Sequence, residues 1–167
     1  MGWSTPSRFV TRCRNEFDIC AVTNDESYAL VEESGAATDE VFATVRRGIR
    51  EADPPSIGTR DWMPLCLSLR DAAGVIVGGV YGATMWRWLL IDGLWVGEPL
   101  RGQGHGRRLL RAAESTAVAR GCLGAWLGTF DFQARGFYER HGYRVFGELA
   151  DFPAGHTHYE LFKLLEC

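Results

Sequence analysis

The sequence lacks the features that mark several protein classes. Its five cysteines are odd in number and widely scattered, and no two of them form a CxxC pair. This spacing indicates neither a disulfide framework nor a zinc site, so we expect no metal and a reducing cytoplasm. No window of the chain reaches membrane-spanning length, and residues 1–15 lack the apolar core of a signal peptide, so we expect no membrane contact.

The chain also lacks an excess of basic residues. Its formal net charge is −3, whereas a nucleic-acid-binding domain usually carries a basic stripe, so we expect no nucleic-acid partner. The arginines at 101, 107, 108 and 111 form a local cluster that suits one multivalent anion better than a polymer. With 167 residues, 46% of them hydrophobic, the chain is long enough for one domain with a proper core.

The most informative stretch covers residues 95–110, WVGEPLRGQGHGRRLL. It passes from a strand-like run through three alternate glycines, Gly102, Gly104 and Gly106, into residues with helical spacing. The first N–H groups of a helix have no intrahelical partner, and the helix dipole adds partial positive charge there. Because glycine has no Cβ, an anion can approach these amides closely. The stretch therefore predicts a phosphate-binding loop.

Two common phosphate loops do not match this stretch. A P-loop needs Lys and then Ser or Thr after its last glycine, whereas Arg107 follows Gly106. The dinucleotide fingerprint would require a glycine at the position of Arg107. The pattern that remains is Arg101-x-x-Gly104-x-Gly106. The alternative interpretation is a glycine-rich helix entry that binds nothing.

The N-terminal part of the chain is weakly patterned. We expect residues 1–25 to form an extension, either mobile or adding an edge strand through the strand-like residues 17–22. Residues 26–167 are then a single domain. Within it we expect a first core strand at residues 27–32 and a helix that Thr38 caps and that ends at residues 53–55.

Three strands in a meander are expected next, at residues 65–70, 75–81 and 88–96. The glycine loop follows the third strand and leads into a helix that ends near Gly121. A strand at residues 125–130, a short helix and a closing hairpin complete the chain. The helix after the loop should bury these apolar residues: Leu109, Leu110, Ala113 and Ala117. This order predicts an α/β (α+β) fold with a mixed sheet, which binds ligands where its strand order splits.

A second motif lies at residues 132–143, FQARGFYERHGY. Together with the Arg101-x-x-Gly104-x-Gly106 loop, one strand–helix unit earlier, it resembles the GNAT superfamily of N-acetyltransferases. A stretch at residues 151–156, DFPAGH, is similar to one in its bacterial small-molecule members. The resemblance covers roughly residues 27–165. It implies a mostly antiparallel central sheet of about six or seven strands flanked by about four helices.

The resemblance also implies a reaction. An acetyl group would pass directly from acetyl-CoA to a primary amine, most simply of a small molecule, within one ternary complex. Two other functions stay open at this point: acetylation of a protein lysine or N-terminus, and a non-catalytic acyl-CoA-binding domain. A homodimer also stays open.

The resemblance implies a cofactor site on both motifs. The loop would offer its backbone amides to the pyrophosphate, and the end of the preceding strand would pair with the pantetheine arm. The cofactor-binding residues are expected to be Leu94, Trp95, Val96, Arg101, Gly102, Gln103, Gly104, His105, Gly106, Arg107, Asp131, Gln133, Ala134 and Phe137. At Asp131 many relatives carry Asn, and an ionised carboxylate cannot donate the hydrogen bond that Asn can.

Three residues are candidates for proton transfer. On the family's pattern Tyr138 would donate a proton to the departing thiolate; the alternative is an aromatic residue that only packs on the sheet. For the base that removes the amine's proton, Asp92 comes first, because simple alternation places it on one strand face with Leu94 and Val96. Glu98, just past the strand, comes second. The alternative for Asp92 is a solvent-facing or ion-paired carboxylate.

Overall fold

The computed structural model describes residues 28–58 and 61–166. Residues 1–55 and 56–167 form two separate compact units. The extension expected at residues 1–25, with its strand-like residues 17–22, lies outside the described residues. The single domain expected at 26–167 stays a prediction. Among the described residues, no helix is both long and apolar enough to cross a membrane.

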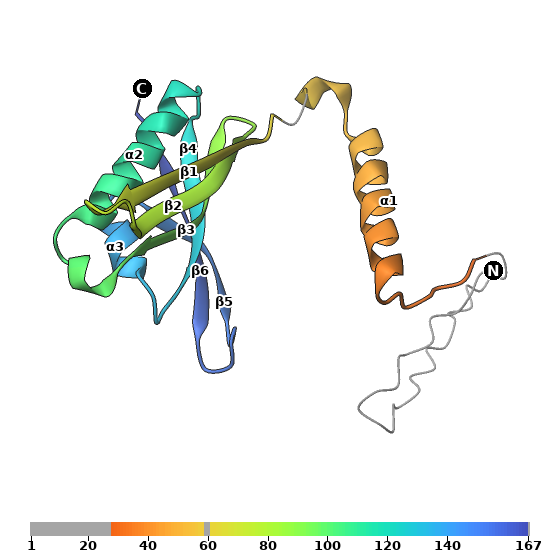
Figure 1. The fold of residues 1–167 in the computed structure, drawn as a ribbon. Helices are drawn as coiled ribbons and strands as arrows, with labels where there is room; N and C mark the ends of the chain where they lie inside the picture. The colour runs from red at the N-terminus through yellow and green to blue at the C-terminus, as the bar shows by residue number, and fades with distance from the viewer. Residues whose placement is uncertain (1–27, 59–60, 167) are drawn as a thin grey trace, which may run out of the picture. The chain divides into compact units, whose positions relative to one another are not determined.

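The first unit contains one long helix, α1 (Ala36–Ala52), drawn in orange in Figure 1. It begins after Gly35, whose φ of 63° is a conformation that glycine adopts easily, so the cap expected at Thr38 was wrong. Its last residue is Ala52 and Asp53 caps its end, in agreement with the end expected at residues 53–55. The core strand expected at residues 27–32 was also wrong: residues 28–34 have no regular structure and are exposed. Alternation alone does not make a strand, because a strand needs a hydrogen-bonded neighbour.

The second unit is a six-stranded sheet in the order β1-β2-β3-β4-β6-β5. Its strands are β1 (Met63–Arg70), β2 (Ile76–Met85), β3 (Trp88–Val96), β4 (Gly124–Phe130), β5 (Arg144–Ala150) and β6 (Thr157–Leu164). All neighbours are antiparallel except β3 and β4, which are parallel. The expectation of a mixed, mostly antiparallel sheet is confirmed.

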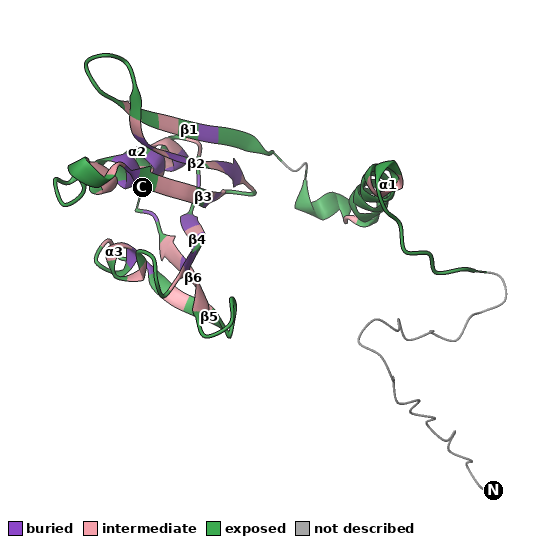
Figure 2. Cartoon of the chain, turned by 60° about the horizontal axis from the view of Figure 1, so that its bottom comes forward, coloured by how far each residue is buried: buried purple, intermediate pink, exposed green. Residues whose placement is uncertain are grey.

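Two helices belong to this unit, α2 (His105–Ala119) and α3 (Arg135–Glu139). α2 buries the four apolar residues that its spacing predicted. They pack against one face of the sheet, where Leu89, Leu127 and Leu161 are almost fully buried, and Tyr138 of α3 belongs to the same cluster. Figure 2 shows these buried residues gathered where α2 and the strands meet. The core therefore lies on the helix-covered face of the sheet.

β3 and β4 separate partway along their length. They pair only from Trp88 opposite Gly124 to Ile91 opposite Leu127. Just beyond this point the β2–β3 register shifts, so that Gly82 faces Ile91 while Tyr81 faces Gly93. Asp92 is the extra residue of this bulge. Parallel strands that diverge leave an opening between their carboxyl ends, and the glycine loop begins at one side of it.

Candidate active site

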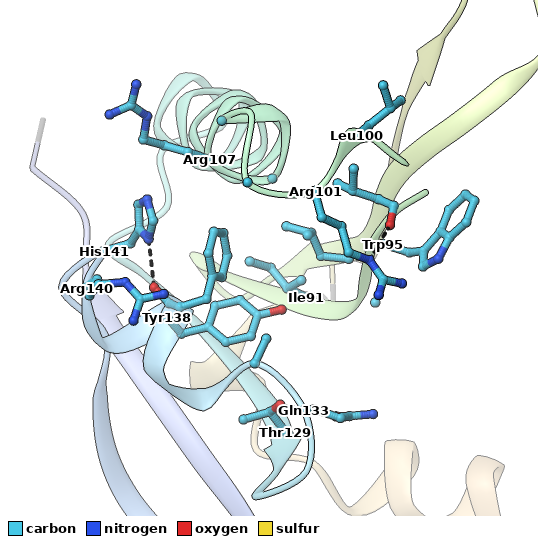
Figure 3. A pocket seen from close by; sticks show the side chains of 18 of the residues that line it. Ile91, Trp95, Leu100, Arg101, Arg107, Thr129, Gln133, Tyr138, Arg140 and His141 are labelled. Carbon is cyan, nitrogen blue, oxygen red and sulfur yellow. Dashed lines mark hydrogen bonds between the residues drawn. The ribbon is translucent and has the colours of Figure 1, made fainter. Parts of the chain in front are cut away.

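A cavity of about 1270 Å³ occupies the opening between β3 and β4. Figure 3 shows side chains converging on it from β3, the glycine loop, α2, β4 and α3. Most of the expected site residues line it: Asp92, Leu94, Trp95, Val96, Arg101, Gly102, Gln103, Gly104, Gly106, Arg107, Gln133, Ala134, Phe137 and Tyr138. Three do not: Glu98, His105 and Asp131. The two motifs, far apart in the chain, thus share one cavity.

The glycine loop presents free backbone amides to the cavity. Gly102 and Gly104 have φ of 76° and 85°, conformations that cost other residues free energy. Within the described residues, Gly102, Gln103 and Gly104 donate no N–H to a backbone carbonyl. Gly104 precedes α2 directly, and no side chain caps this helix start. Unpaired amides and the helix dipole together suit this end of the cavity to an anion.

Three guanidinium groups surround the cavity. Arg107 lies in the first turn of α2, Arg140 directly follows α3, and Arg101 belongs to the glycine loop. The Arg101 Nε donates a hydrogen bond to the Val96 carbonyl at 3.1 Å, which turns this side chain toward β3 rather than away from the protein (Figure 3). Their charge adds to the attraction that the loop amides exert on phosphate groups.

The end of β3 has one open edge. Residues Gly93 to Val96 pair with β2 on one side, and pairing with β4 on the other side stops at Ile91. The backbone groups on that second side face the cavity. An unpaired strand edge can bind an extended chain as though it were another strand. This arrangement fits the expected pairing of Leu94 with a pantetheine arm, whereas the Val96 carbonyl already accepts a hydrogen bond from Arg101.

Tyr138 is buried, with 7% of its surface exposed. Its hydroxyl points into the cavity toward Ile91 (Figure 3). Burial raises the pKa of its phenol above the ordinary value, because the charged form is desolvated. Its ring packs edge-on against Phe137 and Tyr143, at centroid distances of 5.1 and 5.8 Å. Packing thus fixes the ring and keeps the hydroxyl protonated at neutral pH.

Asp92 lies in the cavity wall, but for a different reason from the one predicted. Ile91 and Val96 are both buried in the core, so simple alternation does not hold between them. The bulge resets the alternation and leaves Asp92 exposed at the opening. Among the described residues Asp92 takes part in no ion pair. Arg87, a nearby arginine that could have paired with it, donates its Nε to the Gly121 carbonyl. The carboxylate is therefore available to a ligand.

Glu98 occupies a different place. It begins the short 3₁₀ helix η2 (Glu98–Leu100), is exposed, and lies outside the cavity lining. His105, the first residue of α2, also lies outside it. Their expected roles in catalysis and cofactor binding stay predictions. Of the two candidate bases, the geometry favours Asp92.

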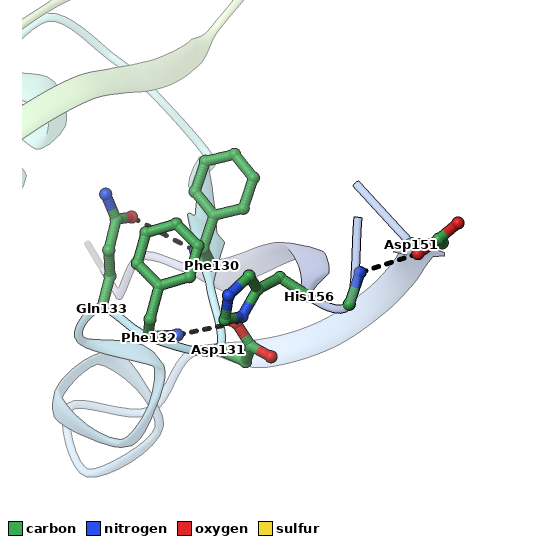
Figure 4. A network of polar contacts seen from close by, with 7 residues as sticks. Phe130, Asp131, Phe132, Gln133, Asp151 and His156 are labelled. Atoms are coloured by element: carbon green, nitrogen blue, oxygen red, sulfur yellow. Dashed lines mark hydrogen bonds and ion pairs between the residues drawn. The ribbon is translucent and has the colours of Figure 1, made fainter. Parts of the chain in front are cut away.

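Asp131 holds two loops together instead of lining the cavity. Its Oδ1 accepts a hydrogen bond from the Phe132 N–H at 2.8 Å and lies 3.1 Å from the His156 Nδ1 (Figure 4). It thus ties the turn after β4 to the loop between β5 and β6. A carboxylate can fill this role because its oxygens accept hydrogen bonds.

Gln133 is held by its carbonyl oxygen. The Oε1 accepts hydrogen bonds from the Thr129 hydroxyl at 3.1 Å and the Phe130 N–H at 3.2 Å. Its amide NH₂ makes no hydrogen bond with the described residues. Because Gln133 lines the cavity, this NH₂ is a fixed donor for a bound ligand. Gln133 can supply the donor that Asp131 lacks.

Several lining residues were not expected from the sequence. They include Leu100, Thr129, Phe132, Arg140 and His141. Phe132, Arg140 and His141 fall within the second motif, so their proximity to Tyr138 was a usable signal. Nothing local marks Thr129, which reaches the cavity only because β4 diverges from β3. The described residues contain no group of three His, Cys, Asp or Glu that could hold a metal ion.

Comparison with known proteins agrees with this geometry. Blasticidin-S acetyltransferase of Streptomyces morookaense is 45% identical over 93 residues, which are 55% of this chain and 68% of the relative. An acetyltransferase of Agrobacterium fabrum is 32% identical over 124 residues, 74% of this chain and 90% of the relative. The crystal structure of a Bacillus cereus acetyltransferase matches with a TM-score of 0.74 and 31% identity, covering 82% of this chain and 98% of that one.

The family model of the acetyltransferase (GNAT) family matches residues 36–143. This span contains the glycine loop, both diverging strands and Tyr138. The chain therefore belongs to the GNAT family of acetyltransferases.

Proposed function

We propose that this protein transfers an acetyl group from acetyl-CoA to a primary amine of a small molecule, directly and within one ternary complex. The observation that carries the proposal is the single cavity that joins an amide-rich helix start to the buried hydroxyl of Tyr138 and the free carboxylate of Asp92. One end suits phosphate groups, and the other holds an acid and a base.

The residues present fit acetyl-CoA. The free amides of residues 102–104 and the arginine side chains suit a pyrophosphate. The open edge of β3 and the NH₂ of Gln133 suit the amide groups of a pantetheine arm. Acetyl-CoA supplies the acetyl group as a thioester, which an amine can attack.

Two side chains would move protons. Asp92 accepts the proton that the amine loses as its nitrogen bonds to the acetyl carbon, directly or through water. Tyr138 donates its proton to the sulfur as the bond between carbon and sulfur breaks. A thiolate, whose conjugate thiol has a pKa of about 8.5, is basic enough to receive help from a well-placed phenol. Tyr138 regains its proton from solvent, and its raised pKa keeps it protonated between turnovers.

The small-molecule acceptor is supported by the relative at 45% identity, which by its name acetylates blasticidin S. Blasticidin S is therefore the first acceptor to test, beside simple alkylamines, lysine and a peptide with a free N-terminus. Free thiol released from acetyl-CoA is measured, and the acetylated product is identified by mass spectrometry.

We expect thiol release that depends on a small amine. Release with the peptide alone would assign the protein to peptide acetylation instead. Binding of acetyl-CoA without release with any amine would support a non-catalytic acyl-CoA-binding domain. An assay with the Tyr138→Phe variant serves as the control for uncatalysed thioester loss.

A further inference from the structure

The sheet has a second face near the cavity, opposite α2. Leu127 pairs with Leu161, and both lie in the core on the helix-covered face. Side chains alternate along a strand, so the next pair, Gly128 and Glu160, points to the opposite face. Phe130 and His158 pair in the same way and share that face. Gly128 also lines the cavity, so this second face adjoins the opening between β3 and β4.

The carboxylate of Glu160 has one charged neighbour among the described residues, the imidazole of His158, and this group carries charge only when protonated. Its Oε2 is buried and makes no hydrogen bond with the described residues. Its Oε1 lies 3.8 Å from the His158 Nδ1, beyond hydrogen-bond distance. About a third of the side chain (34%) is exposed, so Glu160 is partly open to a ligand, although its Oε2 is itself covered. A half-covered carboxylate without a donor is costly.

Nearby cations of β6 and α3 are engaged elsewhere. Arg135 pairs with Glu139 at 2.9 Å and lies over the ring of Tyr159. Lys163 pairs with Glu114 of α2, at 2.9 Å. Both are on the helix-covered face. No lysine or arginine in the described part of the chain forms an ion pair with Glu160.

The glycines on the neighbouring strands make room for this carboxylate. Gly128 of β4 and Gly147 of β5 are its partners on the two neighbouring strands. A Cβ at Gly128 would lie 2.6 Å from the His158 Nε2 and 3.4 Å from the Glu160 Oε1. The imidazole and the carboxylate therefore lie directly over Gly128, which belongs to the cavity wall. Glu160 reaches the edge of the cavity from the second face.

Aromatic rings lie on the other side of His158 from Glu160. Phe130 meets His158 edge-on at 4.7 Å and Phe132 in a stack at 5.0 Å, and Phe152 lies 6.0 Å from Phe130. Phe132 and Phe152 are 56% and 52% exposed. Aromatic faces attract organic cations, and guanidinium groups also stack on them. His158 links these rings to Glu160, since its imidazole meets Phe130 and lies 3.8 Å from the carboxylate. A carboxylate joined to exposed rings in this way is a site for an ammonium or guanidinium group.

We propose that Glu160, with the rings of Phe130, Phe132 and Phe152, binds a second cationic group of the acceptor while its reacting amine lies in the cavity. The proposal rests on the proposed acetyltransferase function and names the class of acceptor: a primary amine that carries an ammonium or guanidinium group at its other end. Glu160 is here a specificity-determining residue that takes no part in the chemistry.

Agmatine and n-pentylamine test this, because each has one primary amine on a short chain and only agmatine carries a guanidinium. We expect Glu160→Gln to lower kcat/KM for agmatine about ten- to a hundred-fold, the range of one charge-assisted hydrogen bond. The value for n-pentylamine should change less than about threefold. Glu148→Gln is the matched control: Glu148 is exposed on β5 and pairs with Tyr159, on the helix-covered face. It should change neither value.

A binding measurement separates this proposal from the proposed function. Agmatine is titrated calorimetrically into the CoA-saturated protein, and melting temperatures confirm that both variants fold. Weaker agmatine binding in Glu160→Gln alone supports the cation site, even if no amine is acetylated. Equal losses for both amines, equal agmatine affinity in the wild type and Glu160→Gln, or no agmatine binding in the wild type would each overturn it.

Discussion

The two ends of the cavity are built from different parts of the protein. At the phosphate end, the consecutive residues 102–104 present backbone amides. At the proposed acceptor end, side chains arrive from separate elements: Asp92 from β3 and Tyr138 from α3 line the cavity, and Glu160 of β6 lies beside its wall. Backbone recognition depends on conformation, whereas side-chain recognition depends on residue identity. Substitutions at the first end should therefore weaken cofactor binding when they alter the backbone, fill the space before it or remove the charge of a nearby arginine.

The largest expected effect lies at the acceptor end. Tyr138→Phe keeps the packed ring and removes the proton donor. We expect kcat to fall about 10²- to 10⁴-fold, the usual contribution of a general acid, with the affinity for CoA nearly unchanged. Steady-state kinetics and calorimetry with CoA measure the two quantities. Full turnover in the variant would assign Tyr138 to packing alone.

A smaller loss is expected at Asp92, because water can also accept the amine's proton. Asp92→Asn keeps the shape but cannot take a proton. We expect kcat to fall about ten- to a hundred-fold and the acidic limb of the rate–pH profile to flatten. A lower melting temperature with the limb in place would indicate a structural role. A raised KM alone would indicate that Asp92 orients a cationic acceptor.

The phosphate end is tested by Gly104→Val. The new side chain adds bulk before the free amides, and the residue has φ of 85°, which valine disfavours. We expect CoA affinity to fall about tenfold or more, equal to about 1.4 kcal/mol. Gly155→Val is the matched control, since Gly155 has φ of 78° and lies outside the cavity lining. If both variants bind CoA equally well, the loop does not hold the pyrophosphate.

The smallest effect concerns a residue outside the cavity lining. Burial, with the Glu114 carboxylate adding to it, raises the pKa of Tyr143 far above its ordinary value of 10.0. The folded protein keeps this proton while the unfolded chain loses it, so stability is full below pH 10 and falls as pH rises above it. The loss is up to about 1.4 kcal/mol per pH unit. In urea unfolding at alkaline pH, the free energy of unfolding should fall less steeply with pH in Tyr143→Phe than in the wild type. The variant should keep its activity.

The sequence predicted the phosphate end because its determinants are local. Glycine at 102 and 104 reflects positive φ values, and the apolar stripe of α2 reflects its packing. The ends of β3 were also predicted, from the turns that bound it. Each of these signals needs only a few neighbouring residues.

The acceptor end was predicted less well because its determinants are distant. The bulge at Asp92 depends on how β2 pairs with β3, which single-strand alternation does not contain. Glu160 meets Gly128 only through the pairing of β4 with β6. Asp131 took a structural role because His156, in a later loop, reaches it. The strand expected at residues 27–32 was wrong for a similar reason. An alternating pattern does not show whether a partner strand is available to pair with it.

The open edge of β3 has one more consequence. The backbone groups that face the cavity are also free to pair with a strand of another molecule, which is how many proteins begin to aggregate. Here the Arg101 guanidinium already occupies the Val96 carbonyl, and Asp92 places a charge at the other end of the edge. Both features hinder a foreign strand. Substitutions that remove the Arg101 side chain or the Asp92 charge should make the protein aggregate sooner at high concentration. Adding CoA should delay this aggregation, because CoA would cover the open edge.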